Sequence, residues 1–110
     1  MKVNKKGHTT TLKDTQGNIQ EFLEKVTHEH NSFKNENLIV DVTHDKNVTL
    51  KDISAFLELS KLHKKGKKSF VIVAESIDYN TVSSKLIVVP TQLEAHDIIE
   101  MEEIERDLGF

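Results

Sequence analysis

The sequence contains no cysteine, and this absence excludes several kinds of chemistry. Disulfide bonds, thiolate nucleophiles and zinc–thiolate sites all require cysteine sulfur. The chain therefore shows no adaptation to an oxidising compartment. The four glycines are isolated and form no phosphate-binding loop, so no cofactor is expected.

Long apolar runs are also missing. The longest span four or five residues, such as 70–74 and 86–89, whereas a membrane-spanning helix needs about 20. The first residues are basic, but no apolar stretch follows them, so no signal peptide is expected. We expect a cytoplasmic protein that does not act at a membrane.

The chain contains a single arginine, Arg106. Bidentate contacts to phosphate and to base edges favour arginine. Residues 100–110 also carry five acidic side chains against that single arginine, within a chain of net charge −3. Because phosphate repels acidic side chains, nucleic acid is disfavoured as the main partner.

The apolar residues that are present alternate between helical and strand patterns. Ile19, Phe22, Leu23 and Val26 fit one helical face, and residues 38–42, 70–74 and 86–89 fit buried strands. The order predicts an α/β domain over residues 1–110. It has a four- to five-stranded, mostly parallel sheet, an N-terminal hairpin and three to four helices.

Two helix starts carry capping patterns. Thr49 precedes Asp52 by three residues, and Thr91 precedes Glu94 in the same way. The first should open a helix that runs to Gly66 and buries one face. That face would hold Leu50, Ile53, Phe56, Leu57 and Ser60.

Several segments resemble the STAS domain, the fold of anti-sigma-factor antagonists. Residues 38–42 are similar to its central strand, residues 62–67 to its "KKxGK" helix end, and residues 91–95 to its "T-x-x-E-A" helix start. The resemblance covers about two-thirds of the chain. It implies a regulatory module that binds another protein and is not an enzyme.

The loop before the second helix departs from that family. The family has a loop of the type "Asp-Ser-Ser-Gly-Leu-Gly" with a phosphorylated serine, whereas Leu50 and Lys51 stand at the two serine positions here. The family's phosphorylation switch is therefore not expected. Thr49 could accept a phosphate at a helix N-terminus, but a simple N-cap is the expected role.

The chain also resembles small bacterial proteins that end in a similar acidic segment and are often labelled ribonuclease Z. That enzyme requires a "His-x-His-x-Asp-His" motif, and the nearest fragment here, residues 28–33, lacks its Asp and last His. The six histidines include no i, i+4 pair and are expected to be solvated surface residues rather than metal ligands. No catalytic residue is predicted, although Asp41 and Asp45 could form an acidic pair at the end of a strand.

The lysines of residues 61–68 fit a helix C-terminus better than an anion site. The last helix has an apolar stripe with some drift, formed by Leu93, Ile98, Met101, Ile104 or Glu105, and Leu108. This stripe could lie in a partner's groove or fold back onto the chain's own sheet.

We expect a non-enzymatic protein-interaction module whose contacts come from the loop and helix start at 43–53 and from the acidic helical tail at about 100–110. The sequence does not exclude association of the chain into a homo-oligomer. An accessory role in RNA processing and a small anion- or nucleotide-binding domain are the alternatives. The candidate contact residues are Thr49, Lys51, Asp52, Glu102, Glu105, Leu108 and Phe110.

Overall fold

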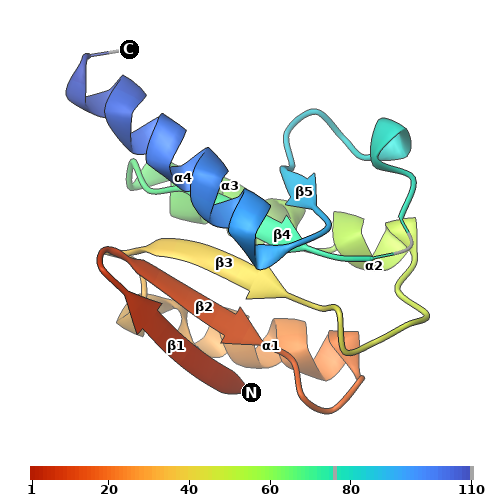
Figure 1. The fold of residues 1–110 in the computed structure, drawn as a ribbon. Helices are drawn as coiled ribbons and strands as arrows, with labels where there is room; N and C mark the ends of the chain where they lie inside the picture. The colour runs from red at the N-terminus through yellow and green to blue at the C-terminus, as the bar shows by residue number, and fades with distance from the viewer. Residues whose placement is uncertain (76, 110) are drawn as a thin grey trace.

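The computed structural model, which describes residues 1–75 and 77–109, shows an α/β fold around one five-stranded mixed sheet (Figure 1). The strands lie in the order in which they occur in the chain. β1 and β2 form an antiparallel hairpin, and β2 to β5 run parallel to one another. The strands are β1 (Lys2–Lys6), β2 (Thr9–Lys13), β3 (Asn37–Asp41), β4 (Phe70–Val73) and β5 (Val88–Val89). The predicted mostly parallel sheet and N-terminal hairpin are thus confirmed.

Helices cover both faces of the sheet (Figure 1). One face carries the first three helices, and α4 crosses the other face. The helical elements are α1 (Ile19–Glu29), the 3-10 turn η1 (His30–Ser32), α2 (Leu50–Ser54), α3 (Leu57–Lys65), the 3-10 turn η2 (Tyr79–Thr81) and α4 (Gln92–Asp107).

The central strands explain the two layers of helices. Successive side chains of a strand point to opposite faces. In β4, Phe70 and Ile72 face the larger core with α1 to α3, whereas Val71 and Val73 face α4. All four are buried. The continuous apolar run is therefore what a parallel strand covered on both faces requires.

The helix predicted from Thr49 to Gly66 is wrong in one respect, because it is two helices. α2 ends at Ser54, and a turn at Ala55 and Phe56 precedes α3. The turn carries the fully buried ring of Phe56 into the core beside Phe22. As a result Leu50, which was expected on the buried face, is partly exposed, while Leu59 and His63 are buried.

The last strand is shorter than predicted, since only Val88 and Val89 of residues 86–89 pair in the ladder. Leu86 is buried in the core with α1 to α3. Within residues 1–75 and 77–109, no helix is both long and apolar enough to cross a membrane.

Candidate functional site

The start of α4 is fixed by a cap and by a contact to the sheet. The Thr91 hydroxyl oxygen accepts a hydrogen bond from the Glu94 backbone N–H at 3.2 Å. The Gln92 amide donates to the Asp41 carboxylate at 2.6 Å, at the carboxyl end of β3. The cap predicted at Thr91 is therefore present, although its hydroxyl also donates to the Glu94 carboxylate at 3.1 Å.

The inner face of α4 uses few residues to cover the sheet. Ala95 and Ile99 are buried against Ile39, Val71 and Val73, and Ile98 packs at the edge of this cluster. A small side chain such as Ala95 lets the helix approach the strands closely. This face, which shares only Ile98 with the predicted apolar stripe, therefore holds α4 on the sheet.

Except for Ile98, the apolar residues of the predicted stripe point away from the sheet instead. The exposed fractions are 72% for Leu93, 62% for Met101, 59% for Ile104 and 67% for Leu108. At 3.6 residues per turn these four positions fall within about a quarter of the helix circumference, roughly opposite Ala95 and Ile99. The expectation that the last helix folds back onto the chain's own sheet is confirmed, but the contact is made by Ala95, Ile98 and Ile99 rather than by these four residues. We call these four residues the outer face of α4.

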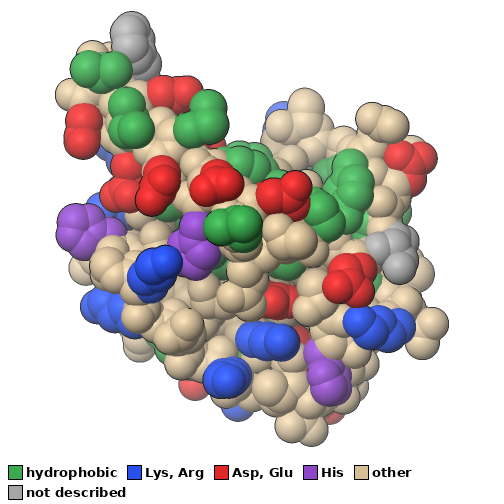
Figure 2. Space-filling model, viewed as in Figure 1, with side chains coloured by type: hydrophobic (Ala, Val, Ile, Leu, Met, Phe, Trp, Pro, Cys, Tyr) green, Lys and Arg blue, Asp and Glu red, His purple; other side chains and the backbone are tan. Residues whose placement is uncertain are grey.

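Acidic side chains flank the outer face, and Asp97 lies within it between Leu93 and Met101. Figure 2 shows apolar and acidic side chains side by side along α4. Soluble proteins rarely leave several large apolar residues exposed on one helix, and such a patch typically marks a contact site. The exposed acidic residues are Glu94, Asp97, Glu100, Glu105 and Asp107.

The distal part of α4 is held by one arginine. The Arg106 guanidinium donates to the Ser69 hydroxyl at 3.1 Å and to the Asn37 side-chain oxygen at 3.2 Å. Ser69 and Asn37 are buried at the amino ends of β4 and β3. Nδ1 of His8 also lies 3.7 Å from the Glu103 carboxylate. Arg106 therefore acts as an anchor beyond the last buried apolar residue of the helix.

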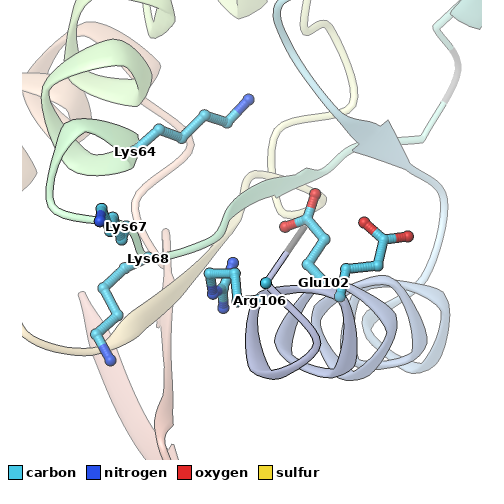
Figure 3. Close-up of a pocket in the computed structure, with 7 residues that line it drawn as sticks. Lys64, Lys67, Lys68, Glu102 and Arg106 are labelled. Carbon is cyan, nitrogen blue, oxygen red and sulfur yellow. The ribbon is translucent and has the colours of Figure 1, made fainter.

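A hollow of about 510 Å³ separates this distal part from the end of α3 (Figure 3). Lysines line the α3 side, and the predicted residues Glu102 and Glu105 line the α4 side together with Arg106. Of the residues drawn in Figure 3, Lys64 extends toward the α4 side, whereas Lys68 points away from it. The two predicted glutamates thus face a hollow with walls of opposite charge. Its lysines are Lys64, Lys67 and Lys68.

The other predicted contact residues lie elsewhere. Thr49 and Asp52 form the expected capping box of α2: the Thr49 hydroxyl accepts from the Asp52 N–H at 3.2 Å, and the Asp52 carboxylate accepts from the Thr49 N–H at 3.0 Å. Lys51 is exposed on the same short helix. In Figure 1 α2 and the end of α4 lie at opposite ends of the molecule. The two predicted segments therefore do not form one surface, and Phe110 lies outside the described residues.

Two histidines contradict the expectation of solvated surface side chains. His30 and His63 are buried, and Nε2 of His30 lies 2.8 Å from Nδ1 of His63. Nε2 of His63 lies 2.7 Å from the Glu36 carbonyl oxygen, which can only accept. His63 therefore donates to Glu36, and its Nδ1 accepts from His30. Burial lowers the pKa of His63 to about 4, and burial and Lys34 also lower the pKa of His30.

The acidic residues at and after the end of β3 accept hydrogen bonds from nearby backbone and side-chain groups. One Asp41 oxygen accepts from the backbone and hydroxyl of Thr43, and the other accepts from Gln92. Asp45 accepts from the Asn47 N–H. The structure thus gives Asp41 and Asp45 separate partners rather than one shared site. Among residues 1–75 and 77–109, no three His, Asp or Glu side chains are grouped so that they could hold a metal ion.

No protein-family model matches this chain, and no curated protein matches it significantly in sequence.

Proposed function

We propose that this protein is a non-enzymatic interaction module and that the outer face of α4 is its contact surface. The observation that carries the proposal is the exposure of four large apolar side chains on one face of a helix that has no structural need for them. Ala95 and Ile99 already attach α4 to the sheet. The outer face is therefore available for another protein.

Charge defines the partner. α4 contains seven acidic side chains, and Arg106 is its only Lys or Arg. A partner that buries Met101 and Ile104 must also face this acidic border. Complementary charges speed association and disfavour wrong partners. The best-fitting partner is a protein surface with an apolar groove or helix face bordered by lysine or arginine.

The class of function agrees with the regulatory, partner-binding role that the STAS resemblance implies. The contact surface differs, since the proposal places it on α4 and not at Thr49 and Lys51. Thr49 uses its hydroxyl and its N–H in the capping box. A surface at α2 stays a separate hypothesis that a Lys51→Glu variant can test.

The test compares two matched variants. Met101→Ser with Ile104→Ser removes two side chains of the outer face, and Val3→Ser removes an exposed apolar side chain of β1. Each protein is titrated with a synthetic amphipathic helix that has leucines on one face and lysines beside them. The outer-face variant should bind at least about tenfold more weakly, because buried apolar anchors dominate such contacts. The Val3→Ser variant should bind like the original protein.

The same variants are also used as bait in affinity pull-downs from an extract of the producing cells. A specific partner should be retained by the original protein and by Val3→Ser, and lost with the outer-face variant. Equal peptide binding by all three proteins, or weakening only by Lys51→Glu, would contradict the proposal. Retention of RNA that depends on the lysines of α3 would favour the RNA-processing alternative instead.

A further inference from the structure

A second exposed surface lies on α3. Glu58, Lys61, Leu62 and Lys65 follow the i, i+3, i+4, i+7 pattern of one helix face and are all exposed. Leu62 has 56% of its surface in water. Around it lies a hollow of about 640 Å³. The residues that line the hollow are Glu58, Lys61, Leu62, Lys64, Lys65 and Lys85.

This α3 hollow is the chemical complement of the outer face of α4. It presents one apolar side chain beside four lysines and Glu58, whereas the outer face presents four apolar side chains beside acidic ones, with Asp97 between Leu93 and Met101. Lysine stems are apolar up to the ammonium group, so they can line a groove while their charges stay in water. An acidic amphipathic helix therefore suits this hollow in both polarity and charge.

The two surfaces of one chain cannot meet. α3 packs on the face of the sheet that holds Phe70 and Ile72, and α4 packs on the face that holds Val71 and Val73. The outer face of α4 is turned further away, since it lies opposite the residues that contact the sheet. Contact between the two surfaces requires two molecules.

We propose that the outer face of α4 of one copy docks into the α3 hollow of a second copy. This inference depends on the proposed function, because it identifies the basic partner of α4 as another copy of the same chain. Because the two surfaces lie on opposite faces of the sheet, two copies cannot exchange both contacts at once. Each bound copy therefore still offers one α4 or one α3 hollow to a further copy. Such contacts build rows of molecules or closed rings rather than a two-fold dimer.

The association should be weak and sensitive to salt. One helix against one helix buries less than the roughly 1,200 Å² of a standard stable interface. The lysines and acids at the border are exposed, so ions screen their attraction beyond about 8 Å at physiological salt. The mean mass in solution should therefore rise with concentration above the 12.6 kDa of one chain, and added salt should lower it.

Sedimentation equilibrium with two variants tests the contact. The variant Met101→Ser with Ile104→Ser lacks the α4 surface but keeps the hollow, and Leu62→Glu lacks the hollow but keeps α4. Each variant alone should stay at 12.6 kDa. An equal mixture should form a complex of two chains and no larger species, because the one intact α4 surface meets the one intact hollow. Val3→Ser should associate like the original protein.

Other outcomes would overturn the inference. An original protein that stays at one chain over the whole concentration range excludes self-docking, as does a mixture of the two variants that does not associate. A species that stops at two chains with the original protein indicates a symmetric contact instead. Lys61→Glu with Lys65→Glu is a second disruption of the hollow, in case Leu62→Glu does not fold. If self-association is absent but the basic peptide still binds α4, only the identity of the partner is wrong.

Discussion

At the scale of single residues, the buried histidine pair links the end of α1 to α3. The pair has room for one additional proton at most. A proton on Nδ1 of His30 leaves both hydrogen bonds in place, whereas a second proton on Nδ1 of His63 would set two N–H groups against each other. A hollow of about 440 Å³ that includes Lys34 reaches the pair from solvent, so acid can reach both rings.

The lowered pKa of His63 predicts that acid destabilises the fold. In the unfolded chain the histidine pKa is 6.5, and in the folded protein that of His63 is about 4. Above pH 6.5 both states are neutral there, and between pH 6.5 and 4 only the unfolded chain binds the proton. The free energy of unfolding should therefore fall as the pH drops through this window, by roughly 1–2 kcal/mol at pH 5. Urea unfolding at pH 7 and pH 5 measures the change.

A His63→Gln variant separates this effect from general acid denaturation. Glutamine can still donate to the Glu36 carbonyl oxygen, but it does not titrate. The variant should be less stable at pH 7 and should lose less stability between pH 7 and pH 5 than the original protein. His28→Gln, on the exposed side of α1, is the control. Equal losses in all three proteins would assign the acid sensitivity to other groups.

Sequence alone could not reveal this pair. His30 and His63 are 33 residues apart, and neither local spacing nor composition distinguishes them from the four other histidines. Thr49 and Thr91 were predictable as caps because the residues that they bind lie three positions away. The difference is between contacts within one turn of chain and contacts that only the tertiary fold creates.

At the scale of elements, α4 is attached at its start by apolar packing and near its end by Arg106. Arg106→Met keeps the apolar stem but removes the hydrogen bonds to Ser69 and Asn37. Hydrogen bonds from charged groups contribute about 1.5–3 kcal/mol, so the last turns of α4 should exchange amide hydrogen at least about tenfold faster. Hydrogen exchange with mass spectrometry of residues 100–109 measures the opening.

The matched control is Asp107→Asn, an exposed neighbour in the same turn. It should leave the exchange of residues 100–109 close to that of the original protein. If Arg106→Met and Asp107→Asn give the same exchange, the arginine does not anchor the helix. Since Arg106 supports the helix that carries Met101 and Ile104, its loss should also weaken binding at the outer face.

Element types followed from the periodicity of the sequence, but their faces and breaks did not. The apolar stripe correctly predicted that α4 is amphipathic. It did not show that Ala95, Ile98 and Ile99 make the contact with the sheet, which leaves the rest of the stripe exposed. The break between α2 and α3 at Ala55 was not predictable from periodicity either. It depends on the packing of the Phe56 ring beside Phe22, which is a tertiary contact.

At the scale of the whole molecule, α4 is the only helix on its face of the sheet among the described residues. A chain that ends at Thr91 would expose Ile39, Val71 and Val73 to water, so it should bind the dye ANS strongly and lose cooperative thermal unfolding. A chain that ends at Asp107 keeps Ala95 and Ile99 and should unfold like the full chain. ANS fluorescence and circular dichroism distinguish the two. Equal behaviour would mean that the sheet does not depend on α4.

The sequential order of the strands has a consequence for how the chain is made. Each strand from β2 to β5 pairs with the strand that precedes it in the sequence, so no strand must be inserted between two that have already paired. Synthesis on the ribosome releases the chain in this same order, from the N-terminus. The sheet can therefore grow strand by strand at one edge as the polypeptide emerges. α4 arrives last to close the open face.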